Sequence, residues 1–158
     1  MRSMLEELGE HELTRGMRPE HLAQLASCAR NVVFMPGTWV CREGEAADTC
    51  WLLRAGQVTL EVTTPAGRKH TVETMEEGGL LGCAWLAPPY QTCFDARVLR
   101  PTRAIALDGA CLRAKTERDP SLGSALFARV ARVLSQRLSA ARVELAAAAS
   151  PPRLRHGA

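Results

Sequence analysis

The segment from Gly79 to Ala96 holds the residues best placed to do chemistry, in the order GLLGCAWLAPPYQTCFDA. Gly82 opens a short apolar run that ends before two prolines, which predicts a single turn of helix set between two strands. The first turn of a helix carries backbone N–H groups without partners and a partial positive charge. The pattern therefore predicts a single helical turn over 82–86, with groups of this kind at its start.

Thiols are the second group with chemical potential. The six cysteines include no C-x-x-C pair, so neither a zinc knuckle nor a thioredoxin-type motif is indicated. We expect free thiols, several of them buried as small apolar side chains. Cys83 and Cys93 fall in or beside the predicted turn, where a helix N-terminus would lower the pKa of a thiol and make it more reactive. A thiol or metal sensor is thus one alternative function.

Motifs for catalysis are missing from the sequence. It contains no G-x-S-x-G, H-E-x-x-H or P-loop pattern, and its four histidines lie far apart, away from metal-ligand spacing. The sequence predicts a protein that is not an enzyme and that has no metal site.

The elements that must position the turn change character along the chain. Residues 1–30 show the apolar spacing of short helices. From 31 to 108 the chain has short runs rich in β-branched residues, separated by Gly and Pro at intervals of about ten residues. This spacing is typical of an antiparallel roll. The expected strands are 31–35, 38–42, 50–54, 57–63, 69–75, 94–99 and 102–107.

Helical spacing returns after residue 108. A short helix is expected over 110–118, and Asp119-Pro120 starts a long one that runs to about 149. The long helix carries an apolar seam at intervals of three and four residues, formed by Phe127, Val130, Leu134, Leu138, Ala141, Leu145 and Ala148. Part of such a seam can lie on the β-roll, but a stripe of this length also suits pairing with a second copy in a parallel dimer.

The predicted fold is mainly β with flanking helices: an antiparallel, jelly-roll-like β-roll with N-terminal helices and a long C-terminal helix. We expect one domain over 1–149, made of a helical lead-in (1–30), the roll (31–108) and C-terminal helices (109–149). The tail 150–158 is expected to be disordered.

Charge and hydropathy indicate where in the cell the protein is expected to lie. The net charge is +3, but residues 1–95 carry 8 basic and 13 acidic side chains, whereas residues 96–158 carry 12 basic and 4 acidic. No apolar run reaches the length of about 20 residues that a membrane helix needs, and the N-terminus has no signal-peptide pattern. We therefore expect a cytoplasmic protein that does not enter a membrane.

The chain resembles the cyclic-nucleotide-binding domain of the Crp/Fnr type over residues from about 10 to about 145. The resemblance rests on FMPGTWVCREGEAAD (34–48), followed by WLLRAGQVTL (51–60). These segments hold the family's Pro-Gly turn, its Arg-Glu-Gly-Glu turn, and a strand that ends in Gly before the next strand. The resemblance identifies Gly79 to Ala96 as the phosphate-binding cassette.

Both charged contacts of typical nucleotide binders are absent from this cassette. The family places a glutamate after the glycine that matches Gly82 and an arginine about nine residues later, and these positions are Cys83 and Thr92 here. Two such contacts are together worth on the order of a hundredfold to several thousandfold in affinity. Arg97 is the nearest replacement for the phosphate arginine, and Arg142 aligns with a position that reaches the base. The candidate ligand-binding residues are Gly82, Cys83, Ala84, Trp85, Thr92, Cys93, Arg97 and Arg142.

The resemblance implies a stand-alone regulatory sensor that binds a small anionic or nucleotide-like ligand, such as a cyclic nucleotide, and signals through its C-terminal helix. We expect a homodimer formed through that helix, an unidentified protein partner and no sequence-specific DNA binding, because no helix-turn-helix follows the long helix. The alternative to the sensor is a degenerate scaffold that acts through protein contacts alone, with Trp85, Tyr90 and Phe94 filling the pocket.

Overall fold

The computed structural model describes residues 1–150, so the tail predicted over 150–158 lies outside the described residues except for Ser150. Two short helices open the chain, α1 (Met4–Glu10) and α2 (Pro19–Ala26). The Ser3 hydroxyl accepts a hydrogen bond from the Glu6 amide, and the Glu6 carboxylate accepts one from the Ser3 amide. This reciprocal cap fixes the start of α1.

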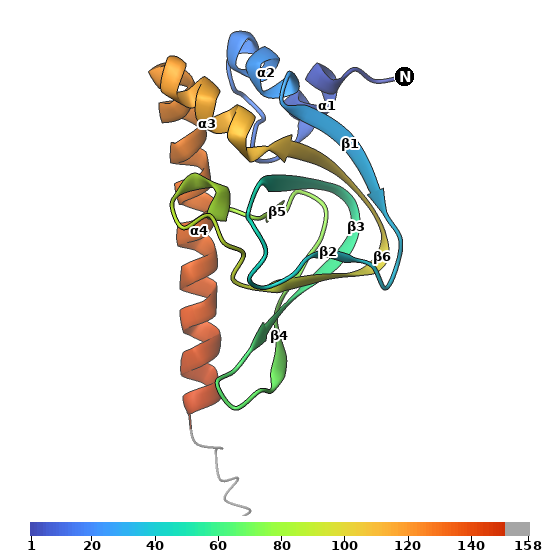
Figure 1. Ribbon diagram of the computed structural model, residues 1–158, viewed down its shortest axis with the longest axis vertical. Helices are drawn as coiled ribbons and strands as arrows, with labels where there is room; N and C mark the ends of the chain where they lie inside the picture. Colours follow the sequence, from blue (N-terminus) through green and yellow to red (C-terminus); the bar gives the residue numbers. More distant parts are fainter. Residues whose placement is uncertain (151–158) are drawn as a thin grey trace, which may run out of the picture.

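Six antiparallel strands within residues 1–150 form one rolled sheet (Figure 1). They are β1 (Ala29–Phe34), β2 (Trp39–Cys41), β3 (Thr49–Thr63), β4 (Lys69–Met75), β5 (Leu80–Leu81) and β6 (Asp95–Asp108). The main order is β1-β6-β3-β4, with β2 paired to β6 and β5 paired to β3. The predicted antiparallel β-roll is confirmed.

Two predicted breaks between strands are wrong. The Ala55-Gly56 step and Pro101 were expected to separate strands, but β3 and β6 run through them as strands of 15 and 14 residues. The β3–β6 register shifts at three steps between Leu53 and Val58, so the glycine and the proline mark an irregular bend in a continuous pair.

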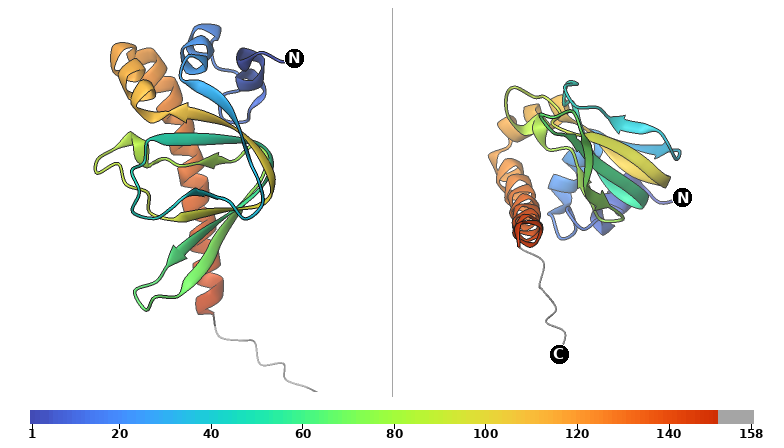
Figure 2. Two further views of the ribbon diagram at one scale, coloured as in Figure 1. Left: turned by 45° about the vertical axis from the view of Figure 1, so that its right-hand side comes forward. Right: turned by 90° about the horizontal axis from the view of Figure 1, so that it is seen from below.

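Two helices close the roll, α3 (Gly109–Arg118) and α4 (Pro120–Ala149), and Asp119 is the single residue between them. In Figure 1, α4 runs along one side of the roll, from the level of α3 down to the level of the β3–β4 hairpin. The view from below in Figure 2 shows α4 lying outside the sheet. None of the helices in the described part of the chain has the length and apolar character needed to cross a membrane.

The core has two parts that share the sheet between them. One lies inside the roll and contains Cys41, Leu53, Val58, Leu60, Met75, Leu81, Ala96 and Val98. The other lies between the roll and the helices and includes Leu8, Leu25, Leu52, Trp85, Ile105, Leu112, Leu122, Leu126 and Val130. The helices therefore cover one end of the roll, while its interior has a separate apolar lining.

The prediction that all six cysteines are free thiols is wrong, because Cys28 and Cys111 form a disulfide with a Cα–Cα distance of 5.7 Å. The two residues are 83 positions apart in the sequence. The β1–β6 ladder brings them together: it pairs Ala29 with Leu107, and the Asp108 amide donates to the Cys28 carbonyl oxygen at 3.0 Å. Of the four free cysteines, Cys41 and Cys50 are buried.

His11 and Glu7 fasten the helical lead-in to β3. The buried His11 ring donates from Nε2 to the Leu53 carbonyl oxygen at 3.1 Å and accepts the Leu13 amide at Nδ1, also at 3.1 Å. A Glu7 oxygen lies 2.9 Å from Arg54 Nη1 on the same strand. Burial lowers the pKa of His11, since the neutral ring is the form that fits this site.

We expect the free energy of unfolding to fall as the pH drops below about 6.5, the pKa of an ordinary histidine. Because the folded pKa of His11 is lowered, its contribution is complete above that pH and is lost on acidification. One proton accounts for at most about 1.4 kcal/mol per pH unit. Denaturant unfolding of natural protein and a His11→Gln variant between pH 5 and 8 measures this slope.

The matched control for that experiment is His70→Gln, because His70 lies exposed on β4. The slope below pH 6.5 should shrink in the His11 variant and persist in the His70 variant. An unchanged slope in both variants would assign the pH dependence to other groups.

Candidate functional site

The predicted one-turn helix exists as η1 (Ala84–Leu86), a 3-10 turn that follows β5. Gly82 joins them with a φ of +88°, in the left-handed region that disfavours side chains. A Cβ at Gly82 would also lie 3.0 Å from the Thr49 carbonyl oxygen and 3.4 Å from the Trp51 ring. Glycine is needed here because the turn passes so close to β3.

A cavity of about 120 Å³ lies beside this turn, inside the mouth of the roll. Four of the eight candidate residues line it: Gly82, Cys83, Ala84 and Thr92. The remaining wall consists of Val40, Cys41, Glu45, Ala46, Ala47, Asp48, Thr49, Trp51 and Phe94. The structure thus brings half of the predicted site to one hollow.

Two residues of the cavity wall have backbone amides without a hydrogen-bond partner among the described residues. The backbone amides of Cys83 and Ala84 donate no hydrogen bond to any group within residues 1–150. Thr92 is held by its backbone, since its amide donates to the Glu45 carbonyl oxygen at 2.9 Å and its carbonyl accepts from the Gly44 amide at 2.8 Å. These groups could bind the oxygen atoms of a small polar ligand.

The charges around the cavity do not favour a phosphate. No lysine or arginine is among the residues that line it, whereas the carboxylates of Glu45 and Asp48 are. Sites for drug-sized ligands usually measure about 300–1,000 Å³. The cavity therefore has room for only a few water-sized groups, and no positively charged side chain from the described part of the chain lines it to bind an anion.

Two of the other candidates, Trp85 and Cys93, lie outside the cavity. Trp85 is 2% exposed and packs in the core between the roll and the helices, next to Gly109. Cys93 is exposed, and its thiol donates to the Gln91 carbonyl oxygen. The aromatic wall of the cavity comes from Trp51 and Phe94 instead.

Arg97 and Arg142 also lie away from the cavity. Arg97 follows the buried Ala96 on β6 and, by the alternation of side chains along a strand, points to the outer face of the roll. There its guanidinium lies 5.5 Å from the centre of the Trp39 ring, which Arg42 and Lys69 also approach. Arg142 is exposed near the end of α4.

The Cys83 thiol is not activated as the sequence predicts. Burial raises its pKa, and the nearby guanidinium of Arg137 offsets this only in part. Desolvation outweighs the helix terminus because η1 is only three residues long. In the described part of the chain no three His, Cys, Asp or Glu side chains come together as metal ligands.

Arg137 of α4 contacts the cassette, although it is not among the site residues predicted from the sequence. Its Nη2 lies 2.8 Å from Glu73 Oε2 on β4, and its Nη1 donates to the Leu80 carbonyl oxygen on β5 at 2.9 Å. Its spacing of seven from the buried Val130 was the available signal, because residues seven apart share one face of a helix. Arg137 joins α4 to the strand that leads into the cassette.

Arg113 of α3 is a second residue that the sequence analysis missed. Its Nη1 donates to the Trp85 carbonyl oxygen at 2.7 Å, and its guanidinium lies 4.3 Å from the centre of the Tyr90 ring. Tyr90 itself has a φ of +51°, unusual for a residue with a side chain. Arg113 therefore holds both ends of the segment between η1 and the Tyr90 turn.

A larger groove of about 470 Å³ lies between α4 and the loop from β4 to β5. Arg129, Arg132 and Arg137 contribute to one wall, and the acidic segment from Glu73 on β4 to Glu77 in the following loop contributes to another. Arg129 is already engaged, because its Nη1 donates to the carbonyl oxygens of Leu13 and Arg15. Arg137, which contacts both β4 and β5, lies in the wall of this groove.

The chain was compared with known families and proteins. Residues 31–119 match the family model described as the cyclic nucleotide-binding domain. A search of the curated proteins finds no match.

Three solved structures show the same architecture. A putative cyclic nucleotide-binding protein from Geobacter metallireducens is 29% identical, with a TM-score of 0.76 over 87% of this chain and 99% of that one. A cyclic nucleotide-binding domain from Methylobacillus flagellatus is 17% identical, with a TM-score of 0.80 over 96% and 85%. The regulatory subunit of a cAMP-independent protein kinase A from Trypanosoma brucei is 17% identical, with a TM-score of 0.72 over 90% and 50%.

Proposed function

Because the chain belongs to the cyclic nucleotide-binding domain family, we propose that it is a regulatory module without catalytic activity that signals through α4. The observation that carries this proposal is the pair of contacts made by Arg137. They link α4 to β4 through Glu73 and to β5 through the Leu80 carbonyl, two residues before the cassette glycine. A shift of the cassette would therefore pull on α4.

The proposed ligand is a small polar molecule of nucleoside-like chemistry rather than a cyclic nucleotide. The free amides of Cys83 and Ala84 and the Thr92 hydroxyl provide hydrogen bonds, but no cation is present to hold a phosphate. The trypanosome neighbour is described as cAMP-independent, and its cAMP-bound form is a variant in which one of three substitutions replaces a threonine with arginine. Thr92 is the residue of this chain at the arginine position of the family.

The size of the cavity suggests how binding would be transmitted. A nucleoside is larger than about 120 Å³ can hold, so its binding requires the cassette to move outward. Such movement strains the contact between Leu80 and Arg137 and biases α4 toward a second position.

The proposed module is a homodimer through the outer face of α4. Phe127, Leu134, Leu138 and Leu145 are 42%, 40%, 51% and 71% exposed in the single chain. With Ala141 they repeat at intervals of three, four and seven, which is the pattern of a two-stranded coiled coil. Val130 is the residue of the predicted seam that packs in the core between the roll and the helices.

Calorimetric titration with nucleosides, cyclic mononucleotides and cyclic dinucleotides tests the ligand. We expect saturable binding of a nucleoside-like compound, weakened roughly 2- to 12-fold by Thr92→Val, which removes one neutral hydrogen bond and keeps the shape. Thr63→Val, at the exposed end of β3, is the matched control. No binding across the panel would favour the alternative, a scaffold that acts through the α4 seam alone.

A second prediction concerns the link between α4 and the roll. Arg137→Gln should lower the free energy of unfolding by about 1–2 kcal/mol, because it removes charge-assisted hydrogen bonds that are only partly exposed. It should also speed hydrogen exchange in β5 and in the adjoining part of α4. Arg142→Gln, on the same helix but exposed, should change stability by less than about 0.5 kcal/mol. Equal effects of the two substitutions would contradict the special role of Arg137.

A further inference from the structure

Helix α3 stands between the cassette and α4 and is attached to both. Arg113 holds the cassette through the Trp85 carbonyl and the Tyr90 ring. At the other end, Asp119 terminates α3 and caps α4, with its carboxylate accepting from the amides of Ser121 and Leu122. The position of α3 therefore affects both parts of the proposed signalling route.

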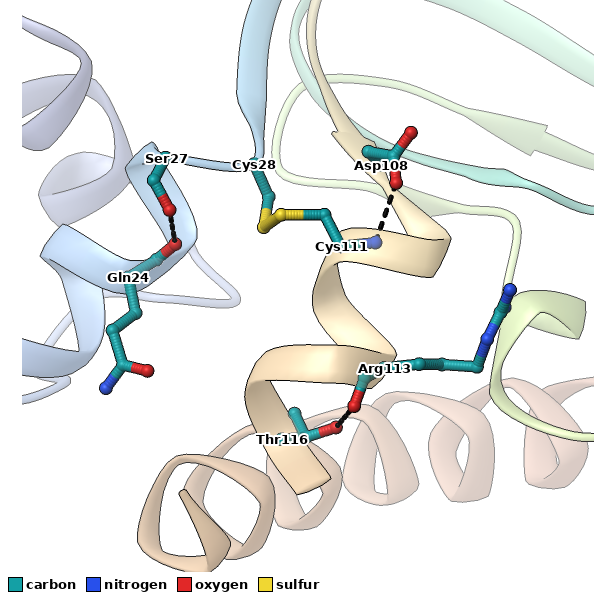
Figure 3. The surroundings of a disulfide bond; sticks show 7 residues. All are labelled: Gln24, Ser27, Cys28, Asp108, Cys111, Arg113 and Thr116. Carbon is teal, nitrogen blue, oxygen red and sulfur yellow. Dashed lines mark hydrogen bonds between the residues drawn. A yellow bond between two sulfur atoms is a disulfide. The ribbon is translucent and has the colours of Figure 1, made fainter. Parts of the chain in front are cut away.

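The start of α3 is fixed by the disulfide, as Figure 3 shows. Cys28, the residue before β1, is bonded to Cys111 in the first turn of the helix. The Cys111 amide also donates to the Asp108 carboxylate at 2.7 Å. From the same helix, Arg113 extends toward the cassette. The disulfide and the cassette contact are thus two residues apart.

We propose that Cys28 and Cys111 form a redox modification site that controls how firmly α3 holds the cassette. In the oxidised form the disulfide fixes the first turn of α3 and keeps Arg113 on Trp85 and Tyr90. Reduction frees this turn from β1, and the cassette loses its outer support. The local effect needs no ligand, and only its consequence for signalling rests on the function proposed above.

The exchange chemistry balances with a dithiol as reductant. A reductant thiolate attacks Sγ of Cys111, the more exposed of the two residues, because Cys28 is only 7% exposed. The Cys28 thiolate leaves and takes up a proton. The second reductant thiol then displaces Cys111, so the protein gains two electrons and two protons while the reductant becomes a cyclic disulfide. A low-molecular-weight disulfide would reverse the reaction.

The other cysteines are poorly suited to compete for this chemistry. Burial raises the pKa of Cys41 to about 12 and raises those of Cys50 and Cys83 as well. Their thiols are therefore protonated and unreactive near neutral pH. Cys93 is exposed, and it supplies the natural control.

Hydrogen-exchange mass spectrometry on the oxidised and the dithiothreitol-reduced protein tests the proposal without any ligand. We expect reduction to speed exchange on the order of tenfold in α3 and in residues 84–92, and much less in β4. The Cys28→Ser/Cys111→Ser variant should match the reduced protein under both conditions. The Cys93→Ser variant should respond as the natural chain does.

The Arg113→Gln variant separates the effect of reduction on α3 from its effect on the cassette. In this variant the cassette should exchange quickly in both redox states, while α3 still responds to reduction. The proposal is overturned if Cys28 and Cys111 are labelled as free thiols in protein kept under the disulfide oxidant, or if reduction leaves the cassette of the natural chain unchanged. If the double serine variant does not fold, reduction of the natural chain decides. A redox response without ligand binding would refute the nucleoside site alone.

Discussion

Aspartate at both Leu138 and Leu145 is expected to convert the proposed dimer into monomers. Both leucines lie on the exposed seam of α4, and a symmetric pair would bury four of them. Each buried leucine contributes about 1.5–3 kcal/mol, so the loss weakens association on the order of ten-thousandfold or more before charge repulsion is counted. Analytical ultracentrifugation over a range of concentrations measures the change.

The control places the same charges on another face of the same helix. Ser139→Asp and Ala146→Asp have the same spacing of seven, and both positions are exposed. We expect this variant to remain dimeric, with helicity equal to that of the natural chain. If the natural chain sediments as a monomer at all concentrations, the seam does not form a dimer interface and the prediction is wrong.

Restoring the two charged contacts of the family is expected to create a cyclic nucleotide site. The Cys83→Glu/Thr92→Arg variant should bind cyclic AMP about a hundredfold or more tightly than the natural chain, because each charge-assisted hydrogen bond is worth about 1.5–3 kcal/mol. Both positions line the cavity, so the new groups start from its wall. Calorimetry and displacement of a fluorescent cyclic nucleotide give the two affinities.

Glutamine at both positions is the matched control, because it supplies similar side-chain length without charge. The glutamine variant should bind no better than the natural chain. If the charged variant also fails to gain affinity while its circular dichroism is unchanged, the size of the cavity rather than its missing charges prevents binding.

The order of strands and helices followed from the sequence, but the continuity of β3 and β6 did not. Gly56 lies across from Pro101, and a Cβ on Gly56 would come within 2.6 Å of the Pro101 oxygen and of Thr102 atoms. The two residues allow one close crossing inside a bent strand pair. From a single sequence the glycine and the proline each predict the end of a strand, because the sequence does not show that they face each other.

Only the part of the candidate site that consecutive residues form could be predicted from the sequence. Gly82, Cys83 and Ala84 are consecutive, so the cassette turn was visible as a pattern and the three residues line one cavity. Arg113 and Arg137 act on partners 28 and 57 residues away, respectively. The partner of Cys28 is likewise set by the β1–β6 ladder. Such contacts depend on strand register, which the spacing of apolar residues leaves undetermined.

The single residue between α3 and α4 makes the long helix a lever. Asp119 ends one helix and caps the next, so a tilt of α3 would reach the first turn of α4 through one residue. At 1.5 Å per residue, the 30 residues of α4 extend about 45 Å from this pivot. A rotation of about 5° there displaces the far end by about 4 Å, so a change of a few tenths of an ångström beside the pivot is amplified roughly tenfold at the tip.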